Sequence, residues 1–119
     1  MLKTDKLITS IVEGIQDRKG HSINVLDLSQ VEGASAQAFV VCSGRSTAQV
    51  EAIADSVMEH VRKDLQDKPT HVHGYRNAQW IILDYGSVMV HIFLPETRTY
   101  YDLEGLWSDA PCETVMDIE

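Results

Sequence analysis

The segment QWIILDYGSVMVHIFLPETRTYYDLEGLW, residues 79–107, carries most of the structural information in this chain. Two apolar runs, Trp80–Asp84 and Val88–Leu94, flank a short turn, and this pattern predicts an antiparallel hairpin of two β-strands. After the second strand, short helical turns are expected at 96–101 and 103–107. The segment holds six of the eight aromatic side chains but no obvious nucleophile and base, so it favours a binding surface over an active site.

Towards the N-terminus, helices alternate with two further strands. Apolar residues recur every three or four positions between Leu7 and Ile15, which predicts a helix, and Gly20 stands where a left-handed helix cap is expected. Strands are predicted at 23–28 and 38–42. The second of these is apolar on both faces, which is typical of a central strand in a sheet covered on both sides.

A second helix is predicted to begin at Ser46, because Gln49 three residues later completes a capping-box pattern. The order of the elements predicts an α/β fold, a single-domain mixed β-sheet flanked by helices. The length of 119 residues fits one domain. We expect this domain to span residues 1–110 and the acidic C-terminal tail, residues 111–119, to fray.

The chain is acidic, with a net charge of −8 and an isoelectric point near 4.9. A surface of that sign repels phosphate, so we expect no direct nucleic-acid specificity. It attracts basic partners, and ribosomal proteins are among the most basic in a cell. The charge is also local, since six acidic and no basic side chains follow Thr99.

A cytoplasmic protein without membrane contact is expected. No apolar run approaches the roughly 20 residues that a membrane span needs, and polar residues interrupt the N-terminal segment, which therefore does not resemble a signal peptide. Cys42 lies in an apolar strand and Cys112 in the polar tail, as expected for free thiols in a reducing compartment.

The histidines give little support for a metal or a cofactor, and we expect neither. Among the five, only His71 and His73 have a ligand-like spacing, and no third and fourth ligand follow at a suitable interval. His91, on the second hairpin strand, is expected to be a half-buried, hydrogen-bonded side chain and a candidate contact residue.

An alternative interpretation is a nucleotidyltransferase-like, nucleotide-binding enzyme. The stretch Ser43-Gly44-Arg45-Ser46 precedes a helix, where free backbone N–H groups can bind phosphate. Such enzymes place a pair of carboxylates on a following strand to hold two metal ions, whereas this chain offers only Asp84. The sequence therefore predicts that the protein is not an enzyme.

The aromatic residues divide between core and surface. Phe93 and one of Tyr100 and Tyr101 are expected to be core, and at least two of Trp80, Tyr85, Tyr100 and Trp107 to line a partner surface. Asp84 is expected to cap the hairpin turn and Gly86 to supply a positive φ, both presenting Tyr85 outward. Tyr85→Ala would then leave the fold intact and weaken partner binding.

Six motifs in order carry a resemblance to the ribosomal silencing factor family, also called RsfS or Iojap-like. They are LDLS at 26–29, FVVCSGRS at 39–46, QVEAIAD at 49–55, WIILDYG at 80–86, VMVHIF at 88–93 and YYDLEGLWSDA at 100–110. Each motif alone is modest, but six at compatible spacing over nearly the whole chain are specific.

The resemblance implies a non-enzymatic translation repressor of the bacterial cytoplasm, with a nucleotidyltransferase-like fold that lacks the active site. Such a protein binds the large ribosomal subunit through the ribosomal protein L-fourteen and blocks joining of the small subunit when nutrients are scarce. Carried onto this chain, the family's partner-binding surface falls on Trp80, Asp84, Tyr85, Gly86, His91, Tyr100, Tyr101, Glu104 and Trp107. The aromatic side chains would supply contact area, and Asp84 and Glu104 would meet basic side chains of the partner.

Three positions depart from the family pattern. Gln37-Ala38 stands where the family often has Asp-Tyr, Ser87 where an acid often follows the turn, and Gly105 in a stretch that is usually more helix-prone. A homodimer that pairs the aromatic surfaces of two copies is a further alternative for the free protein.

Overall fold

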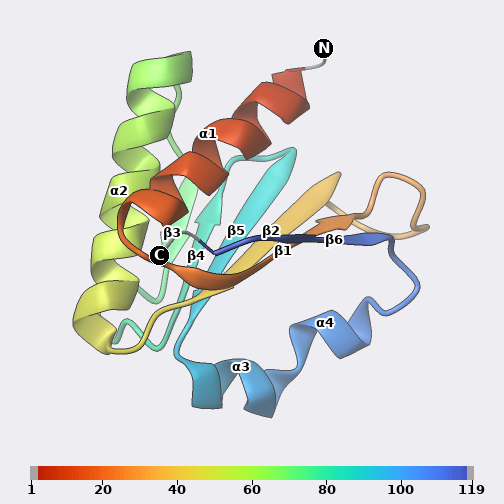
Figure 1. The fold of residues 1–119 in the computed structure, drawn as a ribbon. Coiled ribbons are helices and arrows are strands. Elements are labelled where there is room, and N and C mark those ends of the chain that lie inside the picture. Colours follow the sequence, from red (N-terminus) through yellow and green to blue (C-terminus); the bar gives the residue numbers. More distant parts are fainter. Residues whose placement is uncertain (1–2, 118–119) are drawn as a thin grey trace.

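The computed structural model, which describes residues 3–117, contains a six-stranded sheet with the strand order β3-β4-β5-β2-β1-β6 (Figure 1). The elements follow the chain as α1 (Lys3–Asp17), β1 (His21–Asp27), β2 (Ala38–Ser43), α2 (Thr47–Leu65), β3 (His71–His73), β4 (Trp80–Asp84), β5 (Val88–Phe93), α3 (Pro95–Tyr101), α4 (Leu103–Leu106) and β6 (Cys112–Val115). Strands β2 and β5 run parallel and the other neighbours antiparallel, which confirms the predicted mixed α/β sheet.

The two long helices, α1 and α2, pack together over one face of the sheet (Figure 1). Their apolar stripes, including Leu7, Ile11, Ile53 and Val57, join the side chains that the central strands direct to this face. The helices approach closely at Gly14, where an added Cβ would lie 2.8 Å from the backbone of Val57. Within residues 3–117 no helix is long and apolar enough to cross a bilayer.

The predicted start of α2 is confirmed. Ser46 caps the helix by accepting a hydrogen bond from the Gln49 backbone N–H, and the Gln49 side chain accepts in turn from the N–H of Arg45. The predicted left-handed cap at Gly20 is wrong, because Lys19 takes that conformation, with a φ of 61°. Gly20 is instead a close-contact position, where an added Cβ would collide with the side chain of Ile15.

The predicted hairpin of β4 and β5 is also confirmed. The backbone N–H of Tyr85 donates to the carbonyl of Val88 at 2.9 Å. Asp84 caps the turn through Oδ1, which accepts from the Gly86 N–H at 2.8 Å, and Gly86 has a φ of 84°. Strand β2 is buried along its whole length, as expected for a central strand.

The expectation that the chain frays after residue 110 is wrong for residues 112–115, and residues 118–119 lie outside the part of the chain that the structure describes. Residues 112–115 form β6, an edge strand that pairs with β1 in an antiparallel register from Leu26↔Cys112 to Ile23↔Val115. The Thr114 hydroxyl donates to the Asn24 side chain at 3.0 Å, and Val115 packs against the helix-side core. These contacts with β1 stabilise β6 despite its acidic side chains, and the residues of β1 that make them lie far from β6 in the sequence.

Both Cys42, which is buried, and Cys112, which is exposed, are free thiols as predicted.

Candidate functional site

The sheet face opposite α1 and α2 carries a continuous series of aromatic rings, here called the aromatic face. Strand alternation places Trp80 of β4 and His91 and Phe93 of β5 on this side, while Phe39 comes from β2. Helix α3 adds Tyr100 and Tyr101, and Trp107 follows α4. Neighbouring ring centroids are 5.0 Å apart for Tyr100–Tyr101, 5.0 Å for Tyr101–Trp80, 4.8 Å for Trp80–Phe93, 5.9 Å for Trp80–His91, 4.6 Å for His91–Phe39 and 5.8 Å for Phe39–Trp107.

Burial is graded across the aromatic face. Phe93 is fully buried, as predicted, and Phe39 and His91 are buried beside it, whereas Trp80 and Trp107 are half-buried. Tyr100 and Tyr101 are 81% and 51% exposed, so the expectation that one of them belongs to the core is wrong. Helix α3 is short and directly follows β5, and none of its residues is buried. Two tyrosines are therefore free to contact another molecule.

His91 sits at the centre of the aromatic face and is 3% exposed, more buried than expected. Its Nδ1 accepts a hydrogen bond from the indole N–H of Trp80 at 3.1 Å, which confirms the predicted hydrogen bond and places the ring proton on Nε2. Burial lowers the pKa of His91 to about 4. The side chain is therefore neutral at pH 7, and it orients Trp80 rather than facing solvent.

Acidification is expected to destabilise the protein through His91. The ordinary histidine pKa of 6.5 applies to the unfolded chain, and the folded value is about 4, so the unfolded state takes up the proton first as the pH falls. Stability is then constant above about pH 7 and falls by about 2 kcal/mol between about pH 6.5 and 5. Urea unfolding of wild type and His91→Gln at these pH values measures the effect. If the free energy of unfolding depended on pH equally in the two proteins, the result would contradict this expectation.

An ion pair that the sequence interpretation missed connects α3 and α4 to the sheet. Arg98 donates to both carboxylate oxygens of Glu104, each at 2.8 Å, and to the Ser22 carbonyl and the Ser43 hydroxyl. Asn24 donates to the same carboxylate. The Arg98 hydrogen bond, above all, lowers the pKa of Glu104. Glu104 therefore has its charge paired within the chain and positions α4, while its contact with a basic partner stays a prediction.

Arg98→Met is expected to lower the free energy of unfolding by about 2 kcal/mol, because Glu104 keeps its charge and loses its bidentate partner in a half-buried place. Urea denaturation at pH 7 measures the loss. The double variant Arg98→Met/Glu104→Gln should be less destabilised than Arg98→Met alone, since no unpaired carboxylate remains. A double variant that is less stable than the single one would contradict this account.

The remaining predicted site residues, Asp84, Tyr85 and Gly86, lie in the hairpin turn, and Asp84 and Tyr85 face different sides of the sheet. Asp84 lies on the side of the sheet that carries the aromatic face, with Oδ2 3.8 Å from Nδ1 of His71. Tyr85 points to the other side and is 8% exposed in the helix-side core, so the prediction that it faces outward is wrong. The alternation Ile81, Leu83, Tyr85 continues through the turn and accounts for this direction. An added Cβ at Gly86 would meet nothing within 4 Å, so the turn itself is open.

The residues of the enzyme alternative are not brought together. The Ser43 hydroxyl is engaged by Arg98, and Ser46 caps α2. Asp84 pairs with Met89 near the start of β5, whereas Ser43 pairs with Phe93 at its end. These three side chains therefore serve separate structural roles at opposite ends of the sheet.

A sheet covered by helices on one face and by partly exposed aromatic rings on the other is typical of a protein-binding domain. The comparisons with known proteins are consistent with that class. The model of the family "Ribosomal silencing factor during starvation" matches residues 2–119, and the chain belongs to this family.

Individual relatives agree. The chain is 33% identical over 110 residues to the ribosomal silencing factor RsfS of Halalkalibacterium halodurans, covering 92% of both proteins. It is 39% identical over 98 residues to RsfS of Bacillus subtilis, covering 80% of this chain and 79% of that protein. It also superposes on a crystal structure from Chromobacterium violaceum with a TM-score of 0.84 at 33% identity, covering 90% and 88% of the two chains.

A mouse protein named "Mitochondrial assembly of ribosomal large subunit protein 1" is similar as well. It is 35% identical over 72 residues, which cover 59% of this chain and 32% of the mouse protein.

Proposed function

We propose that this protein lowers translation under nutrient limitation by binding the large ribosomal subunit through the ribosomal protein L-fourteen and sterically blocking joining of the small subunit. The proposal places it in the bacterial cytoplasm, where subunits join, and needs no catalysis. The observation that carries it is the aromatic face, whose outer rings are exposed and have no covering element among the described residues. The mouse relative, named for large-subunit assembly, supports the choice of subunit.

Charge supports a basic partner. Residues 96–119 contain seven acidic side chains and one basic side chain, Arg98, which is already paired with Glu104. Acidic residues around an aromatic patch favour a protein with exposed Lys and Arg, a composition common in ribosomal proteins. The rim residues Asp84, Glu96 and Asp102 join Glu104 as candidates for these charge contacts.

The size of the molecule is sufficient for steric blocking. A standard interface buries about 800 Å² on each partner. That area is about a tenth of the solvent-accessible surface of this protein, which is 7001 Å². The body measures 35 × 34 × 28 Å, so most of it would project from the large subunit into the space that the small subunit must enter.

Sucrose-gradient sedimentation tests the proposal. Purified large subunits are incubated with the protein, small subunits are added, and the joined particle is quantified. Co-migration with the large subunit and loss of the joined particle would support the proposal; co-migration without that loss would indicate an assembly role. Failure to co-migrate would overturn it, and titration with nucleotide and Mg²⁺ would then test the enzyme alternative.

The homodimer alternative is tested with the protein alone. A sedimentation coefficient that rises with protein concentration would indicate a homodimer.

A further inference from the structure

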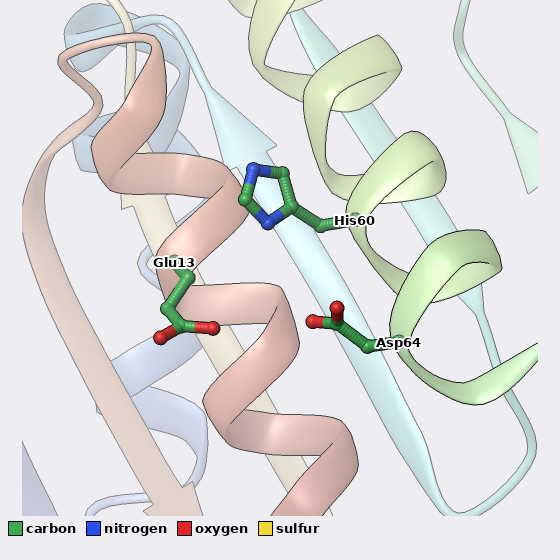
Figure 2. A group of neighbouring side chains, drawn as sticks. All are labelled: Glu13, His60 and Asp64. Atoms are coloured by element: carbon green, nitrogen blue, oxygen red, sulfur yellow. The ribbon is translucent and has the colours of Figure 1, made fainter.

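A cluster of ligand-type side chains lies between α1 and α2, on the opposite side of the molecule from the aromatic face. Glu13 comes from α1, and His60 and Asp64 are one turn apart on α2, so both helices contribute to one place (Figure 2). One ligand atom from each of the three lies within 4.8 Å of the other two. With Gln16, Asp17 and Lys19 they line a surface hollow of about 530 Å³.

The His60 ring is oriented by a carboxylate outside the three. Its Nε2 lies 3.0 Å from Oδ2 of Asp17, one turn along α1 from Glu13. When Nε2–H donates to Asp17, the lone pair is on Nδ1, and Figure 2 shows the other ring nitrogen directed between the carboxylates of Glu13 and Asp64. A histidine that binds a metal commonly has this arrangement, with its second nitrogen bonded to a carboxylate that fixes the ring and its tautomer.

The second carboxylate is held in the same way. Ser10, which is 2% exposed, donates its hydroxyl hydrogen to Oδ2 of Asp64 at 2.8 Å, and this leaves Oδ1 available. The spacing of the two helices is fixed nearby, because Gly14 contacts the backbone of Val57 and its carbonyl accepts from the Ser56 hydroxyl at 2.8 Å. The site is therefore built on two rigid helices rather than on a loop.

We propose that Glu13, His60 and Asp64 bind a zinc ion, with water as the fourth ligand. One imidazole nitrogen and two carboxylate oxygens are ligands that Zn²⁺ accepts in tetrahedral geometry, and the two negative charges neutralise the ion. Mg²⁺ and Ca²⁺ prefer oxygen ligands, so the imidazole nitrogen of His60 favours Zn²⁺ over either of them. The bound ion would link α1 to α2 and stabilise the folded state. This inference does not depend on the proposed ribosomal function.

Zinc titration of the untagged, full chain tests the proposal. Isothermal titration calorimetry with ZnCl₂ at pH 7.5 should show one ion per chain, and the melting temperature should rise with zinc concentration. His60→Gln should abolish both effects. Asp17→Asn, which removes only the orienting carboxylate, should weaken binding by roughly 10- to 100-fold. MgCl₂ at the same concentrations should produce neither effect.

Matched variants on β3 separate this site from the other histidine pair. His71 and His73 are exposed and stack on one another, and His71 lies beside Asp84, so this pair is a competing zinc site in the described chain. The double variant His71→Gln/His73→Gln should bind zinc as wild type does. No binding by wild type, binding that survives in His60→Gln, or binding lost in the β3 variant would each overturn the proposal.

Discussion

Tyr85→Ala is expected to lower the free energy of unfolding by about 3–5 kcal/mol, the range for removal of a buried aromatic ring. The side chain is 8% exposed and packs in the core beneath α1 and α2, so its removal leaves a cavity beside rigid neighbours. A domain of this size has only about 5–15 kcal/mol in total, so the variant is marginally stable. Chemical denaturation followed by circular dichroism measures the loss. A near-neutral result would restore the prediction that Tyr85 faces outward.

Tyr85→Phe is the matched control. The Tyr85 hydroxyl is buried and has no hydrogen-bond partner among the described residues, and burial raises the pKa of the phenol well above its usual value. A buried hydroxyl without a hydrogen bond destabilises the folded state, because it has lost its contact with water. Tyr85→Phe removes this hydroxyl and keeps the ring, so the variant should be as stable as wild type or more stable by up to about 1 kcal/mol. A Phe variant as unstable as the Ala variant would contradict this reasoning.

Replacing both exposed tyrosines, Tyr100→Ser with Tyr101→Ser, is expected to weaken binding to the large ribosomal subunit by about 100-fold or more. Tyrosine is enriched among interface residues whose truncation costs about 2 kcal/mol or more of binding free energy. Two such losses together exceed about 2.7 kcal/mol, which corresponds to a 100-fold loss of affinity. Neither side chain is buried, so the melting temperature should change little. Co-sedimentation over a range of protein concentrations measures the affinity.

Met116→Ser is the control for that experiment. Met116 is 83% exposed, beyond the end of β6, so it tests exposed apolar area away from α3. It should bind the subunit as wild type does. If Met116→Ser weakens binding as much as the double tyrosine variant, the interface does not lie on the aromatic face.

Local patterns in the sequence predict most of the elements correctly. The capping pair Ser46 and Gln49 marks the start of α2, and the Asp84–Gly86 turn joins β4 to β5, because each signal and its partner lie within a few residues. Phe93 is also buried as predicted, as a large apolar side chain on an apolar strand. In each case the information lies within one turn or one strand.

Contacts between distant segments could not be predicted in the same way. Strand β6 pairs with β1, and nothing near Cys112 or Thr114 indicates that partner. The Arg98–Glu104 pair is a second case, because a separation of six positions is not a helical spacing. Asp102, with a φ of 47°, separates α3 from α4 and allows the two side chains to meet. Tyr85 is expected to face outward with the turn, whereas its side chain continues the alternation of β4 and lies in the core beneath α1 and α2.

The pairing of β1 with β6 also determines when the domain can be completed during synthesis. Asn24 and Thr114, which are hydrogen-bonded, are 90 positions apart, so β1 keeps an unpaired edge while most of the chain is being made. Tyr100, Tyr101 and the Arg98–Glu104 pair are translated only shortly before β6. A nascent chain that ends before residue 100 therefore lacks both the strand that pairs with β1 and the exposed tyrosines of α3.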